Sequence, residues 1–237
     1  MSSPHFITPA QLQAAVQQLL KVAHLGKQKA QTKLDRNVLD PFSAAFEMAG
    51  FGMDAARWRE NEAIRQAQKT LTNHVGSFHQ HILGCVAGWE DLGAGKGKQS
   101  TVDLACPSRK LIAEIKNKHN TVKASDQVHT YDALYKCIQE KGQIYHGYTA
   151  YFVEIIPKKP ERYDVPFTPP DNKTGLARAE NGHIRKIDGA SFYTLVTGEQ
   201  YALRDLYRAV LELLNTQFTI SDKAVAMQLF EAAYGAG

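Results

Sequence analysis

Two short apolar runs, a helical pattern and a third apolar run follow one another in this chain and constrain its fold more than any other feature. The runs TVDLAC (101–106) and LIAEIKN (111–117) are joined by PSRK, which is typical of a turn between two strands. Residues 125–140 then carry apolar side chains at helical spacing, with Ser125 as the expected N-cap, and residues 147–156 are rich in aromatic and β-branched residues. This order predicts an α/β fold, with a mixed central β-sheet flanked by helices.

Helical patterns dominate the chain before this core. The pair Thr8-Pro9 predicts an N-cap and a first helical turn, Gly26 predicts the end of that helix, and Gly76 is a possible interruption in a later one. The helices expected here cover 8–25, 41–49 and 54–83. Beyond the core, the pattern predicts a last strand within SFYTLVTG (191–198) and helices at 200–215 and 221–234.

The length of 237 residues and the hydrophobic content of 43% predict a single domain over residues 1–237. Most of the prolines fall between residues 157 and 190, together with many basic and polar side chains, which indicates a long loop, either functional or disordered. The domain then has four parts: a helical N-terminal part (1–85), a core (100–156), the loop (157–190) and a C-terminal strand with helices (191–237).

Charged side chains interrupt the second strand of the predicted hairpin. Glu114 and Lys116 lie two residues apart, so they point to one face while Ala113 and Ile115 point to the other. Asp103, on the neighbouring strand, comes within reach of both. Two converging carboxylates suit Mg²⁺, which typically takes one or two carboxylates, waters and phosphate oxygens, and a nearby lysine can stabilise charge on a phosphorus under attack. The pattern indicates phosphodiester hydrolysis.

A simpler interpretation treats the same residues as the solvated face of an amphipathic strand. Glu114, Lys116 and Lys118 are compatible with that interpretation, and a carboxylate-x-lysine triplet is common. Asp171 and Lys173 form a second such triplet in the proline-rich segment, where no strand is predicted. The triplet alone is therefore weak evidence for a catalytic site, and the surrounding sequence must decide between the two interpretations.

Other function classes find little support. No apolar run approaches the roughly 20 residues that span a bilayer, and the N-terminus lacks the pattern of a signal peptide, so we expect a cytoplasmic protein. GAGKGKQS has no Ser or Thr directly after either lysine, which excludes a P-loop. A net charge of +4 permits a polyanionic partner without demanding one. No zinc-binding spacing occurs among the cysteines and clustered histidines, which are Cys85, Cys106, Cys137, His74, His79 and His81.

The sequence around Asp103, Glu114 and Lys116 resembles the PD-(D/E)xK nuclease superfamily. The matching segments are VD with Asp103, EIK with Glu114 and Lys116, and QVHTY with Gln127 and Tyr131, which is similar to the Q-x-x-x-Y of one branch. Gln127 and Tyr131 are four residues apart, on one face of the following helix. Within the superfamily the chain looks most like a type II restriction endonuclease. VDLACPSRKLIAEIKNKHNT and DGASFYTLVTG are similar to the small group that cuts GGNCC-type sites.

This resemblance implies a restriction-endonuclease-like fold and a homodimer that cuts palindromic double-stranded DNA with Mg²⁺, while a cognate methyltransferase protects the host. It implies that Asp103 and Glu114 are metal ligands, that Lys116 orients the water, and that Gln127 and Tyr131 support the site. Val102 occupies the place of the proline of the family's first motif, a position that often varies. A further acidic group often completes such sites, and the candidates are Glu47, Glu60, Glu62 and Glu90.

Sequence-specific cleavage also needs side chains that reach base edges, typically Arg or Lys to guanine and Asn or Gln to adenine. The loop at 157–190 is the expected source, although its charges could merely keep it soluble. Glycine neighbours favour phosphate contacts for Lys96 and Lys98. The DNA-contacting candidates in the loop are Lys158, Lys159, Arg162, Asn172, Lys173, Arg178, Arg185 and Lys186.

Two other functions fit the same residues. One is a nuclease of the same fold that recognises DNA structure in repair or recombination, and the other is a catalytically silent DNA-binding protein. Retention of the full set Asp103, Glu114 and Lys116 argues against the silent protein, because that protein has no chemical need for all three.

Overall fold

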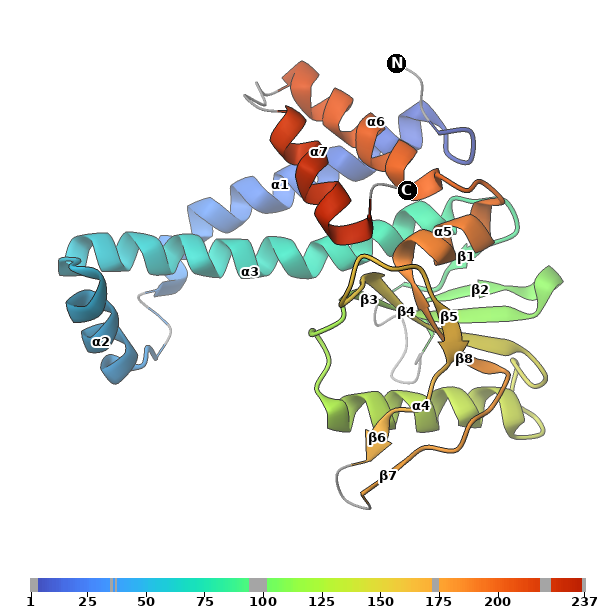
Figure 1. The fold of residues 1–237 in the computed structure, drawn as a ribbon. Helices are drawn as coiled ribbons and strands as arrows, with labels where there is room; N and C mark the ends of the chain where they lie inside the picture. Colours follow the sequence, from blue (N-terminus) through green and yellow to red (C-terminus); the bar gives the residue numbers. More distant parts are fainter. Residues whose placement is uncertain are drawn as a thin grey trace. The chain divides into compact units, whose positions relative to one another are not determined.

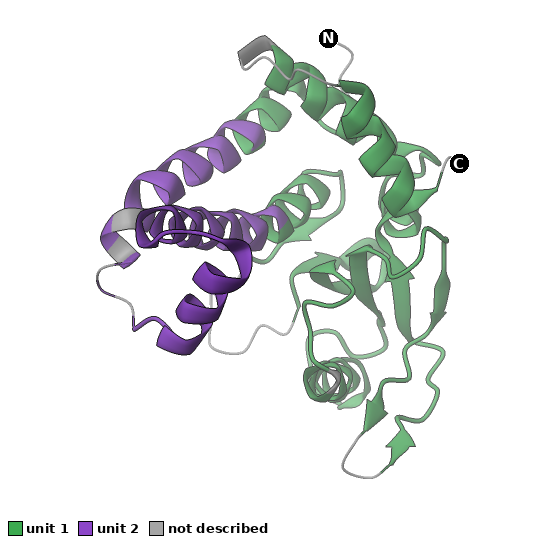
Figure 2. Ribbon diagram, turned by 60° about the vertical axis from the view of Figure 1, so that its left-hand side comes forward, with its two compact units in different colours: residues 1–15, 76–237 green, residues 16–75 purple. Residues whose placement is uncertain are grey.

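The computed structural model describes residues 4–34, 36, 38–93, 102–171, 175–217 and 223–235. The chain divides into two compact units: one comprises residues 1–15 and 76–237, and the other, which we call the helical unit, comprises residues 16–75 (Figure 2). No helix in the described part of the chain combines the length and the apolar character that crossing a membrane requires.

A six-stranded mixed sheet forms the centre of the larger unit, in the order β1-β2-β3-β4-β8-β5 (Figure 1). β2 and β3 pair antiparallel as the predicted hairpin, while β3, β4 and β8 run parallel. A separate two-stranded sheet pairs β6 with β7. The strands are β1 (Glu90–Asp91), β2 (Leu104–Cys106), β3 (Leu111–Lys118), β4 (Thr149–Ile156), β5 (Asp164–Pro166), β6 (Pro170–Asp171), β7 (Leu176–Ala177) and β8 (Ile184–Asp188).

Helices cover both faces of this sheet. On one face, Leu134 and Ile138 of α4 (Ala124–Gln139) join a buried cluster with Ile112 and Phe152 of the sheet. On the other face, Phe192 of α5 (Gly189–Thr197) packs against aromatic rings, and Figure 1 shows α4 and α5 on opposite sides of the strands. The predicted α/β fold, a mixed sheet flanked by helices, is therefore confirmed.

The segment from 157 to 190 is more ordered than the sequence pattern indicated. It contains β5, β6, β7 and β8, and β8 lies inside the main sheet between β4 and β5. Ile184 and Ile187 of β8 are buried, while Arg185 and Lys186 are half-buried. The prediction of one long loop was wrong. The charged residues of β8 hide its apolar pattern in the sequence, and the strand tolerates them because they pair with acidic residues of other strands.

The strand predicted at 191–198 is a helix, α5. The side chain of Asp188 accepts a hydrogen bond from the Ser191 amide at its start, and Gly198, with a φ of 79°, ends it in the left-handed region. The buried residues Phe192, Tyr193 and Val196 follow helical spacing. These caps and this spacing outweigh the preference of aromatic and β-branched residues for strands.

The helix boundaries also differ from the expected ones. α1 (Pro9–Leu34) passes through Gly26, which packs against Ala67, and α3 (Ala55–Gly84) passes through Gly76, so neither glycine ends or interrupts its helix. Ser125 is not the N-cap of α4, because Lys123 occupies that position without a side-chain bond. The remaining helices agree closely with expectation and are α2 (Pro41–Phe51), α6 (Ala202–Gln217) and α7 (Lys223–Tyr234).

Candidate active site

The antiparallel register of β2 and β3 sets the geometry of the candidate site. Leu104 pairs with Ala113, so Asp103 stands opposite Glu114 one step further along the ladder. Side chains directly opposite each other in an antiparallel pair share a face. Lys116, two residues beyond Glu114, belongs to that face as well. The structure therefore brings together the three residues that the sequence singled out.

Main-chain bonds fix the position of Asp103. Its amide donates a hydrogen bond to the Ala113 carbonyl at 2.9 Å, and its Oδ2 accepts one from the Ile115 amide at 2.7 Å. A carboxylate held by the backbone of the neighbouring strand keeps one orientation. One oxygen of Asp103 is thus tied to β3, right beside the carboxylate of Glu114.

Burial and mutual repulsion define the electrostatics of the pair. Burial is the largest effect on Glu114 and, with the neighbouring Asp103 charge, raises the pKa of Glu114 to about 7. Burial also raises the pKa of Asp103, against the opposing effect of the bond from the Ile115 amide. The Lys116 Nζ donates to Glu114 Oε1 at 2.5 Å and partly offsets the repulsion. The site thus sets two carboxylates beside a single lysine.

This donor set fits a hard divalent cation. Mg²⁺ usually takes one or two protein carboxylates and completes its octahedron with waters and substrate phosphate oxygens. Asp103 and Glu114 supply two such carboxylates, and a cation between them would relieve the repulsion that raises both pKa values. Among the described residues no group of three or more His, Cys, Asp or Glu side chains is arranged to hold a metal, so the pair would rely on water and substrate for the remaining positions.

Sequence reasoning missed a side chain from another element that hydrogen-bonds to Asp103. Gln80, near the end of α3 and 5% exposed, donates through Nε2 to Asp91 Oδ1 at 2.9 Å and to the Asp103 carbonyl at 3.2 Å. Asp91 also contributes to the raised pKa of Asp103, after burial. Asp91 directly follows Glu90 in β1. The sequence had suggested the exposed Glu90, and not Asp91, as a further acidic group of the site. The distance of 23 residues between Gln80 and Asp103 hid this contact, because no local pattern connects a helix end to a strand start.

The acidic candidates in the helical unit have other partners. Glu47 accepts hydrogen bonds from Trp58 Nε1 at 2.9 Å and from Arg65 at 3.1 Å. Glu62 is buried and paired with the same Arg65. Glu60 is exposed on α3. Glu47 and Glu62 are therefore committed to an ion-pair network inside their own unit.

The α4 residues of the predicted motif have unequal roles. The hydroxyl of Tyr131 donates to the Ala179 carbonyl at 2.7 Å, and its ring packs against Phe167. Tyr131 thus ties the segment after β7 to α4. Gln127 is half-buried on the same helix. Within residues 102–171, neither side chain hydrogen-bonds to Asp103 or Glu114, so any support from them is indirect in this structure.

Half of the eight DNA-contacting candidates in the 157–190 segment make ion pairs or hydrogen bonds within the protein. Four arginines and lysines are held in this way. Arg162 donates to Thr194 Oγ1 and the Gln200 carbonyl, Arg178 to Asp132 and Asp171, Arg185 to Asp164, and Lys186 pairs with Glu154. Lys158 and Lys159 are exposed. The candidates Lys96, Lys98, Asn172 and Lys173 lie outside the described residues.

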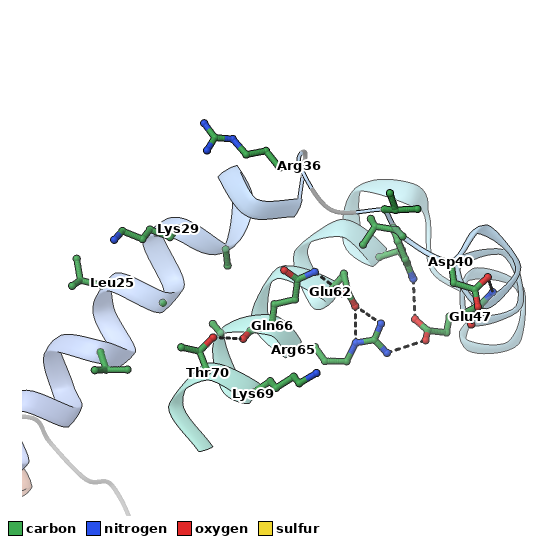
Figure 3. Close-up of a pocket in the computed structure, with 18 of the residues that line it drawn as sticks. Leu25, Lys29, Arg36, Asp40, Glu47, Glu62, Arg65, Gln66, Lys69 and Thr70 are labelled. Carbon is green, nitrogen blue, oxygen red and sulfur yellow. Dashed lines mark hydrogen bonds and ion pairs between the residues drawn. The ribbon is translucent and has the colours of Figure 1, made fainter. Parts of the chain in front are cut away.

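A large cavity lies elsewhere, in the helical unit. It has a volume of about 1100 Å³, and its lining includes Lys29, Arg36 and Lys69 together with the ion pair of Glu62 and Arg65 (Figure 3). None of the residues of the candidate site line it. The candidate chemistry of the chain is therefore assigned to the cluster of Asp103, Glu114 and Lys116 on β2 and β3 rather than to this cavity.

Comparison with known proteins shows the family of this chain. A family model described as the Eco47II restriction endonuclease matches residues 5–218. The type II restriction enzyme Eco47II of Escherichia coli is 43% identical over 244 residues, which cover 99% of this chain and 100% of that enzyme. The type II restriction enzyme Sau96I of Staphylococcus aureus is 33% identical over 178 residues, which cover 73% of this chain and 65% of that enzyme. The chain therefore belongs to the Eco47II restriction endonuclease family and is a type II site-specific deoxyribonuclease.

Proposed function

We propose that this enzyme uses Mg²⁺ to hydrolyse phosphodiester bonds in double-stranded DNA at a short palindromic site of the GGNCC type. The single observation that carries the metal dependence is the half-buried pair of Asp103 and Glu114 beside Lys116. Two carboxylates forced together at a raised pKa form a site that a divalent cation stabilises.

Each of the three side chains has a distinct task in this proposal. Asp103 and Glu114 would hold the ion through carboxylate oxygens. When bound, Mg²⁺ supplies Lewis-acid polarisation of the scissile phosphate and lowers the pKa of a coordinated water. Lys116 is anchored to Glu114 and partly exposed, so its remaining N–H groups can orient the attacking water or stabilise charge on a phosphate oxygen.

Recognition would come from the segment 157–190 and from the glycine-rich segment that contains Lys96 and Lys98. The exposed Lys158 and Lys159 lie two and three residues after the end of β4, the strand that pairs with β3. The bound arginines Arg162, Arg178 and Arg185 could reach DNA only by giving up their present partners or by using N–H groups that those partners leave open. We propose a cytoplasmic homodimer that acts in one system with a cognate DNA methyltransferase, without stable binding between the two enzymes.

A digestion of unmethylated phage DNA tests the proposal. The purified protein is incubated with the DNA in Mg²⁺ and, in parallel, with EDTA, and the ends of the fragments are sequenced. We expect discrete fragments with common ends that spell a GGNCC-type site, in Mg²⁺ only. Fragments in EDTA would contradict the metal dependence, and common ends at an unrelated sequence would contradict the proposed site.

A further inference from the structure

The helix α2 leaves an apolar face uncovered. None of its residues is buried, although its sequence PFSAAFEMAGF is strongly apolar. Phe42 is 75% exposed and Phe46 is 76% exposed, and Val38, just before the helix, is fully exposed. Monomeric soluble proteins rarely leave such aromatic side chains together in water, and an apolar patch of this kind marks an interaction surface.

The exposed face has a regular composition. Phe42, Ala45, Phe46 and Ala49 stand at positions i, i+3, i+4 and i+7, so they form one stripe along the helix, and all four are exposed. The stripe carries no charge. We call these four residues the α2 stripe.

The other side of α2 is already occupied by the helical unit itself. Ser43 and Glu47 line the large cavity of that unit, and Glu47 and Phe51 line a smaller one beside it. Glu47, the single charged residue of the helix, also bonds to Trp58 and Arg65. Neither cavity is lined by a residue of the α2 stripe, so the stripe faces outward from this unit.

We propose that the α2 stripe is the apolar core of the interface between two copies of this chain, which pack α2 antiparallel about a two-fold axis. The stripe is complementary to itself in this arrangement. An axis that passes between residues 45 and 46 places Phe42 opposite Ala49 of the second copy and Phe46 opposite Ala45. Each phenyl ring thus meets a methyl group, and the absence of charge leaves no like charges facing each other across the axis. This inference rests on the proposed homodimer and adds its surface.

The area is appropriate for the core of such an interface. An aromatic side chain buries roughly 150–250 Å² when fully covered, so Phe42 and Phe46 at three-quarters exposure offer on the order of 300 Å². A standard interface buries about 800 Å² on each partner, and a few central aromatic anchors dominate its energy. The stripe thus supplies the anchors, and polar surfaces around it would supply the rim.

A charge on the stripe tests the proposal. Phe46→Glu places two carboxylates near the axis and should weaken the dimer roughly 100-fold or more, as measured by sedimentation of the full chain without DNA. Ile144→Glu, a change at an 85% exposed apolar residue in the larger unit, is the matched control and should sediment like the wild type. Circular dichroism should be unchanged in both variants, because both side chains are exposed. A Phe46→Glu protein that remains as dimeric as the control would overturn the assignment, as would a wild type that is monomeric at micromolar concentrations.

Cross-linking tests the antiparallel register while it keeps both phenylalanines. About the proposed axis, two copies of residue 45 are offset by about 1.5 Å along the helices, but two copies of residue 49 are offset by about 10 Å. A short bismaleimide should therefore join Ala45→Cys chains well above the background from the native cysteines, and Ala49→Cys chains no more than the wild type. Equal cross-linking of both variants would indicate parallel helices and overturn the register.

These measurements separate this inference from the proposed function. Sedimentation and cross-linking need neither DNA nor metal. A dimer that fails to cut DNA would contradict the proposed function alone, whereas Mg²⁺-dependent cleavage by a protein whose dimer survives Phe46→Glu would contradict the surface alone.

Discussion

At the scale of single residues, the protonation of Glu114 couples the site to pH. Its pKa, raised to about 7 from an ordinary value of 4.5, means that the folded chain without metal binds a proton that the unfolded chain has already released in this range. The unfolding free energy of the metal-free protein should therefore fall as pH rises from about 4.5 to about 7. A bound divalent cation prefers the carboxylate and should reverse this trend.

Metal affinity should rise with pH, whereas the unfolding free energy of the metal-free protein falls. Because the ion must displace the proton on Glu114, the affinity for Ca²⁺, used as a non-catalytic substitute, should fall about tenfold per pH unit below about 7 and level off above it. Calorimetric titration from pH 5.5 to 8 measures this, and the released protons can be counted in buffers of different ionisation enthalpy. Glu114→Gln should bind weakly with a much flatter profile. An affinity that does not change with pH in the wild type would show that Glu114 is not a ligand.

At the scale of secondary structure elements, the sequence predicted those parts of the fold that local patterns determine. Alternation along β3 and the length of the hairpin are enough to bring Asp103, Glu114 and Lys116 together on one face. β8 and α5 were missed because their stability comes from elsewhere in the chain. The charges of β8 are matched by Asp164 and Glu154 on neighbouring strands, and no local window contains those partners.

The pair of Lys186 and Glu154 shows how a charged side chain of β8 is tolerated inside the sheet. Glu154 is 2% exposed in β4 and stands next to Lys116 in the register of β3 and β4. It accepts hydrogen bonds from the Tyr163 hydroxyl at 2.7 Å and from Lys186 Nζ at 2.9 Å. Without Lys186, this buried carboxylate would compete with Glu114 for the charge of Lys116.

Lys186→Met should therefore lower stability. We expect a loss of roughly 1–3 kcal/mol in the unfolding free energy, less than for a fully buried pair because the lysine is partly exposed to water. Denaturant unfolding of the metal-free protein measures it, and the double variant with Glu154→Gln should recover most of the loss. Lys159→Met, at an exposed lysine of the same segment, is the control and should change stability by less than about 0.5 kcal/mol. Equal stability of the two single variants would mean that Lys186 is held only loosely and is available to DNA.

At the scale of the whole molecule, the chain combines a sheet unit that carries the candidate chemistry with a helical unit that carries the proposed dimer surface. The helical patterns at 8–25, 41–49 and 54–83 were predictable from spacing. The division at residues 16–75 was not, since α1 and α3 each run unbroken through its boundaries, and Gly76, which lies at the boundary in α3, does not interrupt that helix. The exposed phenylalanines of α2 likewise look like core residues in the sequence, and only the structure shows that their own chain leaves them uncovered.

The central claim is that cleavage depends on the cluster of Asp103, Glu114 and Lys116, and one comparison tests it most directly. Lys116→Ala and Lys118→Ala alter lysines two residues apart on β3, the first bonded to Glu114 and the second exposed. Single-turnover cleavage of unmethylated DNA in Mg²⁺ is measured for both, with DNA affinity measured in Ca²⁺. We predict a loss on the order of 100-fold or more for Lys116→Ala with affinity largely retained, and a change of no more than about threefold for Lys118→Ala. Cleavage by Lys116→Ala as fast as by Lys118→Ala would contradict the assignment of the active site.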